Sequence, residues 1–429
     1  MSKMRIGDLF ELEKGSLQSS KCTEGEFDFI TASKDWKTHN DFSHEVEALI
    51  FAAMASGSLG RTHYVNGKFI TSDLCYILTP KDNDKFPIDL KFYHFVFNSL
   101  KNEIVKNTKS GTSKEAINQT NLKNYEISYF GIEQQHLWIE KLLKTKSIKE
   151  DLTDEAAKQQ TLLKKLRQLI LQDAIEGKLT ATWREQNRDV ESASILLEKI
   201  KAEKEQLIKD KKIKKQKTLP PINGDELPFD IPDSWEWCRL DEISLIGTGA
   251  TPLTSNNEYY KNGNINWVTS SATGNDYVYK AEKKITEKAV LETNCNINPI
   301  GTLVIAMYGQ GKTRGQITEL MIEAATNQAC ATINPYLDKN TLTQYLKKYF
   351  NMIYLEIRKL AAGGSQPNLN MLKIRKTIIP LPPMEEQIEI VKKIKSLFKV
   401  CDELEEQIKS SKTNSQTLMQ SVLKEAFEK

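Results

Sequence analysis

The sequence lacks any long hydrophobic segment and any strong excess of charge. Its longest apolar run covers only residues 48–55, whereas a helix that crosses a membrane needs about 20 apolar residues. Residues 1–8 contain no apolar segment typical of a signal peptide. The net charge is +3, from 60 Lys and Arg against 57 Asp and Glu, which excludes a histone-like polybasic chain and an acidic disordered one. We therefore expect a cytoplasmic globular protein that contacts any nucleic acid through local patches.

Cysteine and histidine are scarce and scattered. The six cysteines form no Cys-x-x-Cys pair, so neither a zinc site nor a disulfide framework is predicted. All five histidines lie in the first third of the chain, which argues against a histidine centre shared by both halves. We expect no metal site in this chain.

Two motifs resemble catalytic elements. Residues 306–313 read Ala-x-x-x-x-Gly-Lys-Thr after a strand-like segment, as in a phosphate-binding loop. Such a loop must open a helix, but residues 314–318 read as a turn and a strand, and the matching residues 54–61 contain no Gly-Lys-Thr. Residues 334–336, Asn-Pro-Tyr, lack one proline of an adenine methyltransferase motif and are better explained as a turn. No active site is predicted, and an ATPase centred on Lys312 remains an alternative.

The two halves of the chain repeat with a period of 252 residues. Residues 132–142 match residues 384–394, with Glu133, Gln135 and Lys141 recurring as Glu385, Gln387 and Lys393. Further on, Leu171, Ala174 and Glu176 recur as Leu423, Ala426 and Glu428. The intervening segment has therefore kept its length, which indicates a rigid element in each half.

Both repeated segments carry the apolar period of an amphipathic helix. The first would be about 65 Å long at 1.5 Å per residue, and helices of that length usually pair. We expect two long, antiparallel coiled-coil helices. The polar stretch 410–416 weakens the apolar seam in the second helix, so a break or a change of partner there remains open.

The segments before each helix match more loosely and read as short β-branched or aromatic strands, polar turns and a few helices. The predicted fold class is α+β, with two similar mixed α/β domains separated by the two long helices. The domains cover residues 1–131 and 228–383, and the helices cover residues 132–178 and 384–429. Residues 179–227 are rich in lysine and contain prolines, which favours a solvated connector.

Two similar domains joined by paired helices suit an extended partner that is read at two places, and DNA is the obvious candidate. Polar loops at matching points of the halves offer hydrogen-bonding and cationic side chains for base edges and phosphates. Because the side chains differ between the halves, two different sequences would be read. The candidate DNA-binding residues are Ser33, Lys34, Trp36, Lys37, Ser58, Arg61, His63, Tyr64, Lys109, Thr112 and Lys114 in the first domain, and Ser270, Ser271, Thr273, Gln310, Lys312, Thr313, Arg314, Ser365, Gln366 and Asn368 in the second. A coiled-coil scaffold whose globular ends bind proteins is a further alternative.

Several segments resemble the specificity (S) subunits of Type I restriction-modification systems. Residues 227–240, Leu-Pro-Phe-Asp-Ile-Pro-Asp-Ser-Trp-Glu-Trp-Cys-Arg-Leu, resemble the start of the family's second target recognition domain. Residues 380–387, Pro-Leu-Pro-Pro-Met-Glu-Glu-Gln, resemble the start of its second conserved helix, and 169–179 with 196–221 resemble its central conserved region. The resemblance covers essentially the whole chain. The first half departs from the pattern because it lacks the Trp-rich prelude and the Pro-Pro pair.

The resemblance implies that residues 1–131 and 228–383 are target recognition domains, each reading one half of a bipartite, asymmetric double-stranded DNA target. The paired helices would fix the gap between the half-sites. Two methylation subunits carrying S-adenosylmethionine would dock on the helices, and restriction subunits that use ATP and Mg would join them. This chain would then hold no catalytic residue, cofactor or metal itself.

Overall fold

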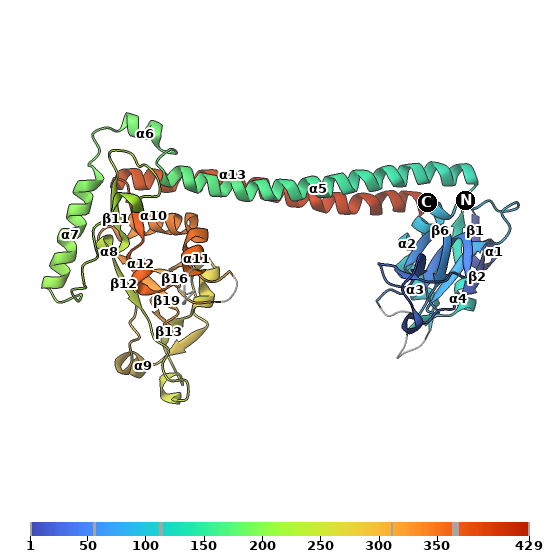
Figure 1. Ribbon diagram of the computed structural model, residues 1–429, viewed down its shortest axis with the longest axis horizontal. Coiled ribbons are helices and arrows are strands. Elements are labelled where there is room, and N and C mark those ends of the chain that lie inside the picture. Colours follow the sequence, from blue (N-terminus) through green and yellow to red (C-terminus); the bar gives the residue numbers. More distant parts are fainter. Residues whose placement is uncertain (1, 55–56, 111–114, 310–311, 363–368, 428–429) are drawn as a thin grey trace. The chain divides into compact units, whose positions relative to one another are not determined.

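The computed structural model describes residues 2–54, 57–110, 115–309, 312–362 and 369–427. The chain divides into two compact units, one made of Met1–Gln159 with Glu406–Lys429 and the other of Gln160–Glu405. Each unit contains one mixed α/β domain and parts of two long helices, α5 (Ile132–Ile175) and α13 (Met384–Phe427) (Figure 1). The α+β prediction with two similar domains is confirmed.

The first domain is built on a six-stranded sheet in the order β2-β7-β5-β6-β3-β4. Only β3 and β6 pair in parallel among these strands. In β5 the side chains alternate between two buried clusters, with Leu49 and Phe51 on one face and Ile50 on the other, as the two-residue period of a strand requires. The strands are β2 (Phe10–Lys14), β3 (Phe27–Ile30), β4 (Lys37–His39), β5 (His44–Ala52), β6 (Thr62–Thr71) and β7 (Cys75–Pro80).

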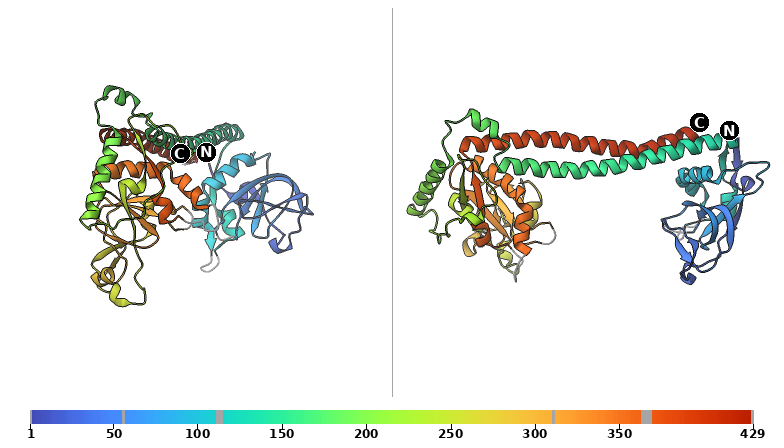
Figure 2. Two further views of the ribbon diagram at one scale, coloured as in Figure 1. Left: turned by 60° about the vertical axis from the view of Figure 1, so that its left-hand side comes forward. Right: turned by 45° about the horizontal axis from the view of Figure 1, so that its top comes forward.

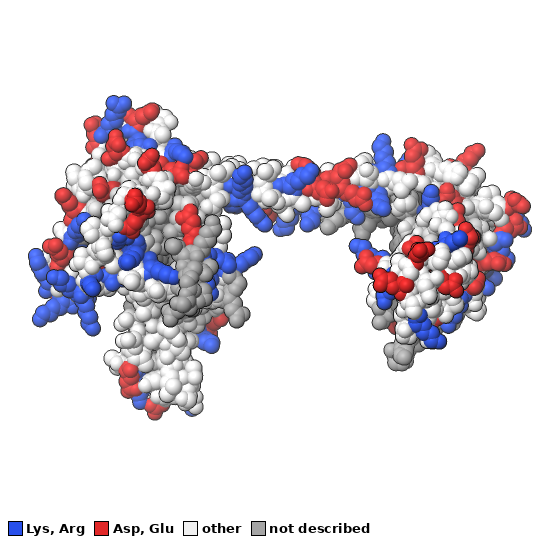
Figure 3. Space-filling view, in the orientation of Figure 1, with Lys and Arg blue, Asp and Glu red and all other residues white. Residues whose placement is uncertain are grey.

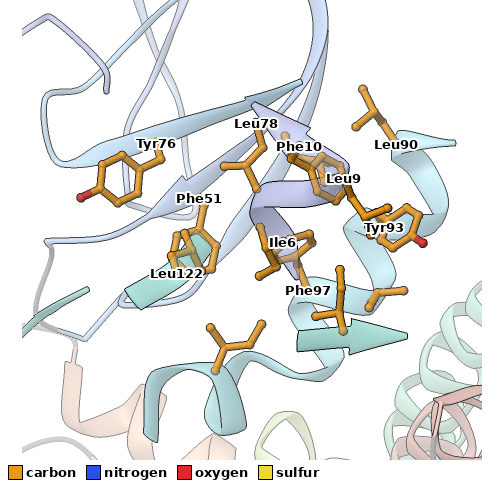
Figure 4. Close-up of a cluster of buried hydrophobic side chains, with 14 of the residues drawn as sticks. Ile6, Leu9, Phe10, Phe51, Tyr76, Leu78, Leu90, Tyr93, Phe97 and Leu122 are labelled. Atoms are coloured by element: carbon orange, nitrogen blue, oxygen red, sulfur yellow. The ribbon is translucent and has the colours of Figure 1, made fainter. Parts of the chain in front are cut away.

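Helices cover one face of this sheet and form the larger core (Figure 4). Phe10 meets the rings of Tyr93 and Phe97 edge-on, at centroid distances of 5.3 and 5.7 Å, an arrangement that aromatic quadrupoles favour. The Tyr93 hydroxyl donates to the carbonyl of Ser128. The smaller elements of the domain are α1 (Ile6–Leu9), η1 (Ser19–Lys21), α2 (Leu90–Ser99), α3 (Lys101–Thr108), β8 (Lys109–Ser110), β9 (Ala116–Ile117) and α4 (Gln119–Asn124).

The second domain has a five-stranded sheet, β12-β19-β16-β17-β14, and a three-stranded sheet, β15-β13-β18. The strands are β12 (Ser244–Thr248), β13 (Ile265–Val268), β14 (Tyr277–Val278), β15 (Lys283–Ile285), β16 (Leu303–Ala306), β17 (Ile317–Leu320), β18 (Ala325–Thr326) and β19 (Cys330–Pro335). The helices are η2 (Gly224–Glu226), α8 (Leu240–Ile243), η3 (Asn257–Tyr259), η4 (Ser270–Gly274), α9 (Glu287–Glu292), α10 (Lys339–Met352), α11 (Tyr354–Ala362) and α12 (Met371–Arg375). Buried β-branched residues such as Val304 and Ile305 explain why β16 is central in its sheet.

A short antiparallel ladder closes each domain. In the first, β1 (Ser2–Arg5) pairs with β10 (Glu126–Tyr129), and in the second, β11 (Glu236–Arg239) pairs with β20 (Ile378–Leu381). The helices that follow, α5 and α13, both begin and both end 252 residues apart. The structure therefore confirms the period found in the sequence.

The recurring glutamines have the same structural role in both halves. Gln135 is buried, and its Nε2 donates to the carbonyl of Phe130 at 2.7 Å. Gln387 is equally buried, and its Nε2 donates to the carbonyl of Pro382 at 2.9 Å. Each amide thus satisfies a buried carbonyl just before its long helix, which would otherwise destabilise the fold.

Within each unit, the parts of α5 and α13 that it contains lie side by side and run antiparallel (Figure 2). In the first unit, Val422 of α13 packs against the cluster that contains Leu142 of α5. In the second unit, Arg167 of α5 donates to Asp402 of α13 at 2.6 Å. The polar stretch 410–416 does not interrupt α13, which is one continuous helix. Within the described residues, no helix is long and apolar enough to cross a membrane.

A buried carboxylate joins three segments at the start of α13. The side chain of Glu386 is fully buried and forms an ion pair with Arg184. It also accepts hydrogen bonds from Thr180 Oγ1 at 2.6 Å and Trp235 Nε1 at 2.8 Å. In α5 the position 252 residues earlier is Gln134, which is exposed. The carboxylate therefore fastens the segment after α5 to the start of α13, and among the described residues of the first domain the exposed Gln134 makes no equivalent contact.

The lysine-rich segment differs from the solvated connector predicted from composition. It contains two α-helices, α6 (Ala181–Gln186) and α7 (Ala193–Lys209), besides η2 near its end. Leu196, Leu197 and Ile200 of α7 are buried, at the i, i+1 and i+4 spacing of one helical face. The lysine-rich composition of the whole segment did not indicate this docking, which rests on three apolar side chains of α7.

Alkaline pH should destabilise the fold because buried thiols resist ionisation. Burial raises the pKa of Cys75 and of Cys330 from 9.0 to about 12. Between these values the unfolded chain loses the thiol protons while the folded chain keeps them, so stability falls as pH rises, by about 1.4 kcal/mol per pH unit for each thiol. We expect the urea midpoint to fall from pH 9 to 11. Buried Tyr93 and Tyr345, whose pKa values are also raised, add to this above pH 10.

A Cys75→Ala/Cys330→Ala double variant is the control for this prediction. Its urea midpoint should fall less steeply between pH 9 and 10, where the thiols act before the tyrosines. A wild-type midpoint that stays constant over this interval would contradict the assigned shifts.

Candidate nucleic-acid interface

Three of the predicted residues, Ser33, Ser58 and Arg61, lie in the turn after β3 and the turn before β6 of the first domain. Arg61 Nη1 donates to the carbonyl of Ala32 at 3.0 Å and to Ser58 Oγ at 3.1 Å. Beside Ala32, the Ser33 hydroxyl donates to the carbonyl of Asp35 at 2.7 Å. Arg61 therefore holds the two turns together, and part of its hydrogen-bonding capacity is used within the domain.

An aromatic pair lies beside these turns. Trp36 Nε1 donates to His63 Nδ1 at 3.3 Å, and the two rings meet edge-on with centroids 5.8 Å apart. Burial lowers the pKa of His63, and the charge of Arg61 adds to this effect. His63 therefore remains neutral near pH 7 and orients Trp36, whose side chain is 38% exposed. An oriented, exposed indole can stack on a base or pack against a sugar.

Other predicted residues of the first domain do not join this group. Tyr64 follows His63 on β6 and points to the opposite face, where its hydroxyl donates to Glu47 at 2.7 Å. Lys109 forms an ion pair with Glu115, with 2.6 Å between Nζ and Oε1. Lys34 and Lys37 are exposed beside Trp36 in the chain. Thr112 and Lys114 lie outside the described residues.

In the second domain the predicted loop is the short helix η4. Thr273 is buried, and its hydroxyl donates to the carbonyl of Ser270 at 2.8 Å, so it stabilises the turn and does not reach solvent. Ser271 is exposed, and its hydroxyl lies 2.8 Å from that of Thr269. Ser270 and Ser271 therefore remain candidates for contact, whereas the prediction of direct contact for Thr273 does not fit its burial.

A buried lysine that the sequence reasoning missed holds the end of this loop. Lys347 of α10 is 2% exposed, and its Nζ lies 3.5 Å from Glu319 Oε2 on β17. The same Nζ donates to the carbonyl of Asp276 at 2.5 Å and lies 3.3 Å from the ring centroid of Tyr277. Burial lowers the pKa of Lys347 against the opposing charge of Glu319. The sequence signal that could have indicated its burial is its position next to the apolar face of α10.

The loop between β16 and β17 carries the predicted basic residues. Lys312 is exposed and its carbonyl accepts from the Tyr354 hydroxyl, which in turn accepts from Arg358 at 2.8 Å. Thr313 and Arg314 are half-buried. The loop therefore rests on α11 and presents the Lys312 side chain to solvent. Gln310, Ser365, Gln366 and Asn368 lie outside the described residues.

The structure contradicts the nucleotide-binding alternative for this loop. The chain continues from Thr313 into strand β17, whereas a phosphate-binding loop places the backbone N–H groups of a helix start around the phosphates. Among the described residues, no group of His, Cys, Asp or Glu side chains could hold a metal ion. Both signs of charge are mixed over the domains in Figure 3, in keeping with contact through local patches.

Comparison with known proteins gives one consistent result. The family described as "Type I restriction modification DNA specificity domain" matches residues 1–180 and 232–411. The EcoEI specificity subunit of Escherichia coli is 30% identical over 257 residues, which are 57% of this chain and 42% of that subunit, so the match spans less than half of that relative. The EcoDI specificity subunit of Escherichia coli is 23% identical over 99% of this chain and 87% of its own length.

Solved structures show the same fold at low sequence identity. An HsdS subunit from Thermoanaerobacter tengcongensis has a TM-score of 0.60 at 16% identity, covering 99% of this chain and 96% of its own. A chain from a structure of the assembly and conformational transition of the type I R-M system has a TM-score of 0.61 at 16% identity, covering 99% and 97%. These likenesses establish the fold alone.

Proposed function

Because the chain belongs to the Type I restriction modification DNA specificity family, we propose that it is the non-catalytic subunit that reads a bipartite, asymmetric DNA target for a methylation and restriction complex. The observation that carries this proposal is the duplicated domain with different side chains on one frame. Trp36 and His63 form a pair beside the turns that precede β4 and β6 of the first domain, whereas the loop between β16 and β17 of the second domain carries Lys312. Two domains of the same fold with different contacting groups suit two different half-sites.

The long helices suit the docking of partner subunits. Apolar side chains on α5 are exposed at Leu137 (54%), Leu143 (50%) and Ile148 (42%), and Val400 on α13 is 51% exposed. A contiguous exposed apolar patch on a protein surface marks an interaction site, and we place these side chains in such a surface. Two methylation subunits would dock here, and restriction subunits would join in the complete complex. The paired helices would set the gap between the half-sites.

The chemistry would belong to the partner subunits. S-adenosylmethionine on the methylation subunits, and ATP with Mg on the restriction subunits, would supply methyl transfer and DNA translocation or cleavage in the cytoplasm. This chain would contribute the recognition of the DNA sequence, since its candidate residues are suited to hydrogen bonds with bases and to phosphate contacts. The proposal accounts for polar loops on a rigid frame without requiring a catalytic group in them.

Co-expression with the methylation subunit of the same system tests the proposal. We expect a stable complex and adenine methylation at one asymmetric, bipartite target in the host genome, read by methylome sequencing. Trp36→Ala should alter the preference in one half-site only, because Trp36 belongs to one domain. Omission of this chain is the control. Absence of both the complex and site-specific methylation would rule out the proposed role, and a complex without a DNA footprint would favour the protein-scaffold alternative.

A further inference from the structure

Helix α7 divides its lysines between two sides. Lys201 and Lys204 face the second domain, where Lys201 Nζ lies 3.3 Å from Glu242 Oε1 and Lys204 Nζ donates to the carbonyl of Asp241 at 2.7 Å. These contacts lie beside the buried Leu197 and help to dock the helix. The ammonium groups of both lysines therefore already have acidic or carbonyl partners within the second unit.

The lysines at the end of α7 and just beyond it face solvent. We call these residues the lysine strip: Lys209, Lys211, Lys212, Lys214, Lys215 and Lys217. Among the described residues, the strip's only side-chain ion pair connects Lys212 Nζ to Asp210 Oδ2 at 3.6 Å, where both groups are exposed. Figure 3 shows a dense group of blue side chains at this end of α7 (compare Figure 1).

The backbone of the lysine strip is fixed to the second domain. After α7, the N–H of Lys212 donates to the carbonyl of Leu207 at 3.0 Å. Arg375 Nη2 donates to the carbonyl of Lys217 at 3.0 Å, and Arg239 Nε donates to the carbonyl of Pro220 at 2.9 Å. The strip is therefore held at both ends, and its like charges are kept close together. Such an array is stabilised when a polyanion neutralises it.

We propose that the lysine strip binds the phosphate backbone of duplex DNA, without reading sequence, at a place separate from the recognition loops. The inference rests on the proposed function and extends it to DNA outside the target. A protein partner fits less well, because a protein interface usually has an apolar centre, and among the described residues of 209–217 no large hydrophobic side chain is exposed. Lysine is a point charge suited to phosphates and carries no base preference by itself.

The test compares wild type with the full-length variant Lys209→Gln/Lys212→Gln/Lys214→Gln/Lys215→Gln on two duplexes. One duplex carries the target sequence with only a few flanking base pairs. The other carries the same target sequence with long flanking DNA. Each neutralised phosphate contributes about 0.9 to the slope of log K against log salt. On the long duplex we expect the variant to lose about tenfold or more in affinity and up to about 3.6 in slope. On the short duplex its affinity should stay within about twofold of wild type.

Two matched variants separate a local contact from net charge and from structure. Lys144→Gln/Lys158→Gln/Lys164→Gln/Lys165→Gln removes the same charge from exposed positions of α5 and should keep the wild-type affinity for the long duplex. Arginine at the four strip positions should also keep it. Thermal unfolding of each variant, followed by circular dichroism, verifies that it is folded.

Each other outcome would overturn the inference. No loss on the long duplex would make the strip a solvated surface, and an equal loss on both duplexes would place it in the recognition interface. An equal loss in the α5 variant would indicate a bulk charge effect. Normal DNA binding with lost assembly of a partner subunit would identify a protein ligand. If wild type does not prefer its target over a scrambled duplex, the proposed function itself fails.

Discussion

Glu386→Ala should lower the free energy of unfolding of the second unit by about 3–5 kcal/mol, because it removes a buried carboxylate from its cationic and neutral partners. Arg184 would lose its ion pair, and Trp235 and Thr180 would lose the acceptor for their hydrogen bonds. Urea unfolding followed by fluorescence measures the loss. Hydrogen exchange should show that α6 and the first turns of α13 lose protection before the sheet does.

The repeat supplies a matched control for this variant. Gln134→Ala changes the corresponding position of α5, which is exposed, and should cost no more than about 0.5 kcal/mol. Glu386→Gln keeps the size of the side chain and some of its hydrogen bonds, so its cost should fall between the two. Equal costs for Glu386→Ala and Gln134→Ala would show that the buried contacts do not stabilise the unit.

Lys347→Met should also lower stability by about 3–5 kcal/mol, because it leaves Glu319 buried without its cation. Glu319 would retain the hydrogen bond from Gln344 Nε2 at 2.8 Å, but its charge would be uncompensated. The carbonyl of Asp276, at the end of the η4 loop, would lose its donor as well. Under the proposed function, we therefore expect weaker discrimination in the half-site assigned to the second domain. Denaturant unfolding and methylome sequencing measure the two effects.

A second substitution distinguishes the charge from the packing at this place. Lys347→Met/Glu319→Gln removes both charges and should be more stable than Lys347→Met alone, since no ion is left buried. Lys339→Met changes an exposed lysine of the same helix and should stay within about 0.5 kcal/mol of wild type. If the double variant is less stable than Lys347→Met, an uncompensated charge is not the cause of the loss.

The long helices could be predicted from the sequence because their length and register depend on local periodicity. The roles of the recurring residues could not. Gln135 and Gln387 recur visibly, but only their burial shows that each amide satisfies a carbonyl before its helix. Likewise, nothing in the repeat indicates that Glu386 is buried and Gln134 exposed, because that difference depends on the segment that covers α13.

The structure brings some of the candidate residues together and separates others. The sequence located the turns around Trp36 and Arg61, which the structure brings together, since turns carry recognisable polar residues. The sequence grouped Tyr64 with His63, whereas the alternation of the strand points the two side chains to opposite faces of the sheet. It offered Thr273 as a contact, whereas the hydroxyl closes its own turn. Docking of α7 depends on tertiary contacts that lysine-rich composition conceals.

The paired strands that close each domain have an evolutionary consequence. Arg5 stands opposite Glu126 in the first ladder, and Arg239 stands opposite Ile378 in the second. The chain therefore enters and leaves each domain through neighbouring strands. A domain of different sequence whose ends pair in the same way can replace it without changing the length or phase of the helices. Under the proposed function, each domain would be an exchangeable cassette, and recombination within these ladders would change the DNA sequence that is read while the two long helices stay the same.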